Sequence, residues 1–81
     1  MEIILSDELK DMIDKEVKRG LEKWGKVDTS PQVFLNAALE ELGEVAHAIN
    51  HNEGVGVIVQ EIAETMGILT RLFYMVYYGI H

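Results

Sequence analysis

The 81-residue chain contains no cysteine, a single proline, and only seven basic residues against 14 acidic ones. Without cysteine, the chain can form neither a disulfide framework nor a thiolate metal site. The formal net charge of -7 argues against nucleic acid and against an anionic membrane as partners. An acidic chain can still bind a phosphorylated ligand if metal ions reverse the local field.

Long apolar segments are also missing at both ends. Residues 1–5 lack the basic end and the extended apolar core of a secretion signal. The apolar run near the C-terminus is interrupted by Arg71 and is too short to span a membrane. Internal repeats and linkers are absent, so we expect one cytoplasmic domain over residues 1–81.

Hydrophobic residues, in contrast, are abundant and make up 48% of the chain. A chain of this length can bury only a modest fraction of its surface. Because it carries more apolar side chains than a small monomer can easily hide, we expect a homodimer or homotetramer.

Three segments have helical periodicity. Ser6 is suited to cap a helix over residues 7–24, and Ser30-Pro31 marks the start of a second helix over 31–50. A third helix is expected over 57–78, after a turn rich in asparagine and glycine. The predicted fold is all-α, with three main helices completed by oligomerisation into a bundle. Gly20, inside the first helix, either permits a close helix crossing or is simply tolerated at a cost of about 1 kcal/mol.

Each of the later helices has a predicted apolar stripe. The stripe of the second helix comprises Phe34, Leu35, Ala38, Leu42, Val45 and Ile49. The main stripe of the third comprises Ile62, Thr65, Leu69, Leu72, Phe73 and Val76. Glu61 and Glu64 are expected on an adjoining face of the third helix, with Ile68, Arg71 and Met75.

Glutamates form two spaced motifs in these helices. An E-E-x-x-E run ends at Glu44, and an E-x-x-E run spans Glu61 to Glu64. Residues three apart share a helix face, and a short connection makes the two helices antiparallel neighbours, so the carboxylates of Glu41, Glu44, Glu61 and Glu64 could converge. Carboxylates that meet in this way repel one another unless a cation lies among them. Oxygen ligands suit Mg²⁺, or alternatively Mn²⁺.

At these residues the sequence resembles the all-α nucleoside triphosphate pyrophosphatase superfamily, the MazG-like group. The family motif is E-E-x-x-E followed on the next helix by E-x-x-D, and Lys23-Trp24-Gly25 is also similar to the group. Glu64 stands where the family usually has aspartate. Many relatives also continue into a further helix beyond the third.

This resemblance implies hydrolysis of a nucleoside triphosphate to a monophosphate and pyrophosphate, in a role such as clearing unwanted nucleotides. It implies that Glu41, Glu44, Glu61 and Glu64 hold magnesium, and that Glu40 orients the attacking water or acts as its base. Candidates for substrate contacts are Lys23, Lys26 and Arg71 at the phosphates, on charge alone, and Trp24 as core or pocket wall.

Two other hypotheses stay open. The chain could be a non-catalytic oligomeric helical protein that binds a metal or a partner, as the Glu64 substitution and the missing further helix suggest. Alternatively, Glu44 and His47 form an E-x-x-H motif of the kind found in di-iron bundles, which need a second copy of the motif. His47 is expected to be exposed, because it lies away from the apolar stripe.

Overall fold

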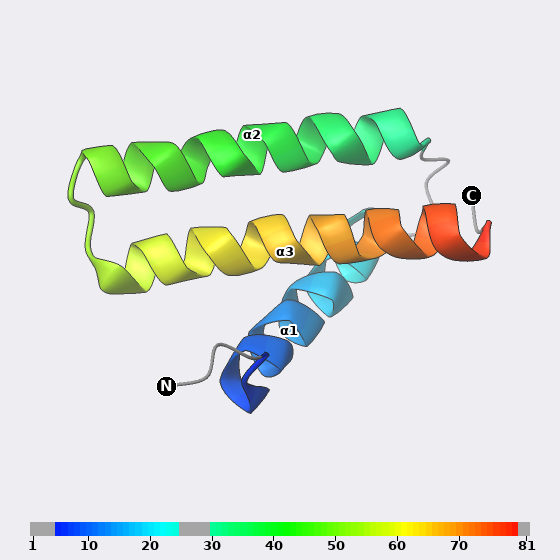
Figure 1. Ribbon diagram of the computed structural model, residues 1–81, viewed down its shortest axis with the longest axis horizontal. Coiled ribbons are helices and arrows are strands. Elements are labelled where there is room, and N and C mark those ends of the chain that lie inside the picture. Colours follow the sequence, from blue (N-terminus) through cyan, green and yellow to red (C-terminus); the bar gives the residue numbers. More distant parts are fainter. Residues whose placement is uncertain (1–4, 25–29, 80–81) are drawn as a thin grey trace.

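The computed structural model describes residues 5–24 and 30–79, and all the regular structure within these ranges is helical (Figure 1). The helices are α1 (Asp7–Trp24), α2 (Pro31–Asn50) and α3 (Val55–Tyr78). The predicted all-α class is therefore confirmed. Helix α3 begins two residues earlier than predicted, because Gly54 already serves as its N-cap and its carbonyl accepts a bond from the Ile58 amide at 3.1 Å.

Side-chain caps fix the starts of α1 and α2. The Ser6 hydroxyl accepts a hydrogen bond from the Leu9 amide at 3.1 Å, and the Ser30 hydroxyl accepts one from the Val33 amide at 3.4 Å. Both bonds satisfy an amide that has no partner within the helix. The first two helices therefore begin where the sequence predicts.

Helices α2 and α3 form an antiparallel hairpin, and α1 crosses α3 obliquely (Figure 1). In the described part of the chain α1 packs against α3 but does not reach α2. Gly67 makes the crossing close, because a Cβ atom built there would lie 2.8 Å from the Cβ of Glu16. Helix α3 is thus the central element, with α1 and α2 on two of its faces.

The buried core residues of α2 and α3 are mostly small. They are Phe34, Ala38, Val45, Ala48, Ala63, Thr65, Gly67 and Met75. The predicted stripe of α2 is therefore wrong in part, because Leu35, Leu42 and Ile49 are about half exposed. In α3 the predicted main stripe is also wrong in large part. The face that carries Ile68, Arg71 and Met75 points inward instead, because α1 and α2 both pack against that side of α3.

Many of the other large apolar side chains of the hairpin are exposed along one side of each helix, and we call this set the apolar face. It consists of Leu35, Leu39, Leu42 and Ile49 on α2, and Val55, Val59, Ile62, Leu69, Phe73 and Val76 on α3. Leu42 is 55% exposed and Val76 is 66% exposed. None of the described helices is long and apolar enough to cross a membrane.

Candidate metal-binding site

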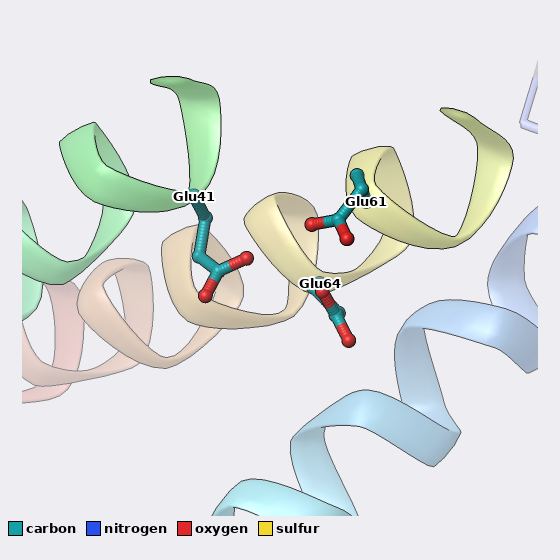
Figure 2. A group of neighbouring side chains, drawn as sticks. All are labelled: Glu41, Glu61 and Glu64. Carbon is teal, nitrogen blue, oxygen red and sulfur yellow. The ribbon is translucent and has the colours of Figure 1, made fainter. Parts of the chain in front are cut away.

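Three glutamates from the hairpin direct their carboxylates into one space (Figure 2). Glu41 extends from α2, and Glu61 and Glu64 extend from successive turns of α3. One carboxylate oxygen of each residue lies within 4.8 Å of the others. The predicted convergence of carboxylates from the two helices is therefore present for Glu41, Glu61 and Glu64, which we call the glutamate triad, but it does not include Glu44.

The local sequence explains why charged side chains point inward here. Glu41 lies three residues after Ala38 and four before Val45, both of which are buried, so it shares their face of α2. On α3, Glu61 and Glu64 precede Ile68 on the face that packs toward α1 and α2. Small neighbours such as Ala38 and Ala63 leave room for the longer glutamate side chains.

The electrostatics of the triad follow from this placement. Burial raises the pKa of Glu61 to about 7, and the neighbouring Glu64 carboxylate adds to the shift by hydrogen bonding to the protonated form and by charge repulsion. Burial also raises the pKa of Glu41, with further contributions from Glu64 and Glu44. Three negative charges at this position are therefore unfavourable near neutral pH unless a proton or a cation neutralises them.

Helix α1 contributes an ion pair that sequence reasoning missed. Arg19 Nη2 lies 3.0 Å from Glu64 Oε1 and 3.3 Å from Glu16 Oε1. Gln60 Nε2 also donates to Glu16, at 3.3 Å. Glu64 therefore does have a basic partner, but it comes from another helix. The position of Glu16 could have indicated this network, since it shares a helix face with the apolar residues Leu9 and Ile13.

A cavity of about 390 Å³ lies between α1 and α2, over α3. Glu41 and Glu64 line it together with Glu16, Arg19 and Arg71, and its apolar walls include Val33, Phe34, Ala37 and Ile68. Its volume is in the range of small-molecule sites, which combine apolar walls with a few polar groups. Two members of the glutamate triad, Glu41 and Glu64, therefore border a space that could hold an organic ligand.

The other predicted site residues differ in their positions. Glu40, Lys23 and Arg71 line the cavity. Glu44 is exposed and lies outside the group of three. Lys26 and the side chain of Trp24 lie outside the described part of the chain.

His47 is exposed, as predicted, and lies toward the connection between α2 and α3. Its Nε2 is 3.5 Å from a carboxylate oxygen of Glu53, and its ring centroid is 4.2 Å from that of His51. It is separate from the glutamate triad.

The donor set of the triad suits a small, hard cation. Mg²⁺ binds oxygen ligands at about 2.1 Å, so two of its ligand oxygens can be up to about 4.2 Å apart. The observed limit of 4.8 Å requires only a small rotation of flexible glutamate side chains. Because the second oxygen of Glu64 is not held by Arg19, it can still bind a cation.

Comparisons with models of protein families, with curated proteins and with solved structures found no match for this chain.

Proposed function

We propose that this protein is a magnesium-dependent nucleoside triphosphate pyrophosphohydrolase that acts as a MazG-like homo-oligomer. The observation that carries the proposal is the glutamate triad, whose carboxylates come from both halves of the E-E-x-x-E and E-x-x-E motifs and two of which, those of Glu41 and Glu64, line a ligand-sized cavity. The raised pKa of Glu61 supports it, because a cation would offset both the desolvation by burial and the repulsion between neighbouring carboxylates.

In this proposal the glutamates have separate roles. Glu41, Glu61 and Glu64 hold Mg²⁺, or Mn²⁺ in its place, and exposed Glu44 adds negative charge nearby. When bound, the metal supplies charge neutralisation at the phosphates and lowers the pKa of a water. Glu40 faces the same cavity and orients the water that attacks the α-phosphorus. The bond to the β-phosphate then breaks, giving a monophosphate and pyrophosphate.

The cavity supports a substrate that has both charge and apolar surface. The triphosphate is drawn to bound metal and to basic side chains, among which Lys23 and Arg71 line the cavity. Phe34, Val33 and Ile68 offer an apolar wall to the nucleoside.

Pyrophosphate release from a panel of nucleoside triphosphates, measured with magnesium, tests this function. We expect Glu61→Gln to reduce kcat/KM by about 100-fold or more, because it removes one metal ligand. Glu53→Gln is the matched control, since Glu53 pairs with His47 outside the triad, and it should retain activity. Unchanged turnover in Glu61→Gln would contradict the assigned role.

A second candidate is a non-catalytic metal-binding protein. The pairing of Arg19 with Glu64 favours it, because the arginine already neutralises part of the triad's charge. Magnesium binding without turnover of any nucleotide in the panel would support this candidate over the enzyme.

The oligomeric part of the proposal is supported by the exposed surface. Large apolar side chains such as Leu42, Phe73 and Val76 are each more than half exposed, and contact with a partner subunit would remove this apolar surface from water. The apolar face is the surface we propose for this contact, because a second copy laid on it gives a four-helix arrangement.

A further inference from the structure

Arg71 differs from the other arginine at the cavity. Arg19 is paired with two carboxylates, whereas within residues 5–24 and 30–79 no hydrogen bond or ion pair is made by Arg71. Its guanidinium carbon lies 4.6 Å from the centroid of the Phe34 ring. Burial lowers the pKa of Arg71, but an arginine remains charged at any physiological pH. The cavity thus contains a partly buried cation whose N–H groups bind no carboxylate among the described residues.

Gly20 creates the space that this cation occupies. A Cβ atom built on Gly20 would lie only 2.8 Å from Nη1 of Arg71 and 3.7 Å from its Cζ. Any side chain at position 20 would therefore push the guanidinium away from its place against Phe34. A glycine inside a helix costs about 1 kcal/mol relative to alanine, so α1 is less stable as a helix at a position where Arg71 approaches it.

The chemistry of an arginine in this setting points to an oxyanion. The ring of Phe34 covers one face of the guanidinium, while its N–H edges keep the planar geometry that pairs with phosphate oxygens. Arg71 lies seven residues after Glu64 on α3, which places it about 10 Å farther along the helix axis. The cavity is therefore lined by the Glu64 carboxylate and, about two helix turns farther along α3, by Arg71, a spacing that matches a phosphate chain bound to a metal.

We infer that Arg71 forms a phosphate-binding subsite in the cavity and that Gly20 is its positioning residue. This subsite rests on the proposed function in one respect, because the phosphate is taken to belong to the ligand held at the glutamate triad. The subsite itself is built from α1, α2 and α3 without any triad residue, so it can be tested separately.

Inorganic tripolyphosphate is the probe, and the Nε–H resonance of Arg71 in a nitrogen-15 spectrum at low salt is the readout. The resonance is identified by its disappearance in Arg71→Gln. We expect tripolyphosphate to shift it both with magnesium and, at millimolar concentration, without metal. Affinity in the presence of magnesium should fall tenfold or more in Arg71→Gln, as expected for loss of a charge-assisted hydrogen bond.

Two glycine variants test the positioning role. Gly20→Ala should weaken tripolyphosphate binding several-fold and move the Arg71 resonance, while thermal unfolding shows no loss of stability. Gly43→Ala is the matched control, because a Cβ there meets nothing within 4 Å and binding should not change. Combining Gly20→Ala with Arg71→Gln should add nothing to the effect of Arg71→Gln alone.

An Arg71 resonance that tripolyphosphate leaves unmoved in both conditions overturns the subsite, and Arg71→Gln is needed only to assign the resonance. Equal affinity in Gly20→Ala and the unaltered chain overturns the positioning role. Manganese binding, measured by water relaxation without any phosphate, reports on the triad separately. If manganese does not bind, the proposed metal site is wrong. The titration of the Arg71 resonance with tripolyphosphate in the absence of metal still decides whether Arg71 binds phosphate.

Discussion

Binding of a divalent cation to the glutamate triad should release protons, in an amount set by Glu61. With its pKa raised to about 7, Glu61 is half protonated at pH 7, and a carboxylate must lose its proton to bind a metal. We therefore expect about 0.5 proton released per metal bound at pH 7, rising to about 0.9 at pH 6 and falling to about 0.1 at pH 8. Glu41, whose pKa is also raised, can only add to this release.

Isothermal titration with MnCl₂ measures this directly, in pairs of buffers that differ in ionisation enthalpy. Glu61→Gln should bind the metal more weakly and lose most of the proton release near pH 7. Glu53→Gln, altered outside the triad, should behave as the unaltered chain does. Metal binding with no release at pH 6 would refute the reasoning, because it would mean that the cation is held elsewhere or that Glu61 is already ionised.

Three further results are expected. Gly67→Ala should destabilise the fold by about 1 to 3 kcal/mol in urea unfolding, because the new methyl group would meet Glu16 across the α1–α3 crossing. Gly43→Ala is the control, because its new methyl group has no atom within 4 Å, and it should be neutral or stabilising by up to about 1 kcal/mol. Without metal, stability should decline as pH rises from about 4.5 to about 7, because the folded chain holds a proton on Glu61 that the unfolded chain has lost; flat stability over this window would contradict the burial argument. Leu42→Glu or Leu69→Glu should dissociate the oligomer in analytical ultracentrifugation, and an unaltered chain that is monomeric at about 100 µM would rule out the contact through the apolar face.

The sequence was sufficient to predict the helices and the meeting of Glu41 with Glu61 and Glu64. Capping and proline signals such as Ser30-Pro31 are local, so they act in the chain as they do in any helix. The short connection makes α2 and α3 neighbours without reference to the rest of the chain.

The buried face of each helix was harder to predict. Helix α2 carries two apolar stripes, one through Phe34 and Val45 and one through Leu35 and Leu42, and periodicity alone does not distinguish the inner from the outer one. The pairing of Arg19 with Glu64 joins residues 45 positions apart, and it depends on how α1 crosses α3. Neither local spacing nor composition determines that crossing.

Among the described residues, helix α1 packs against α3 and not against α2, and this affects how a ligand could reach the cavity. All three triad carboxylates belong to the α2–α3 hairpin, and α1 closes the cavity from the side through the contact at Gly67 and the pair between Arg19 and Glu64. Outward movement of α1 would break its contacts with α3 and leave the α2–α3 hairpin intact, so it should cost less free energy than global unfolding. Replacement of Arg19 by a cation at Glu64 would remove one of these contacts, and binding of the metal should therefore weaken the attachment of α1.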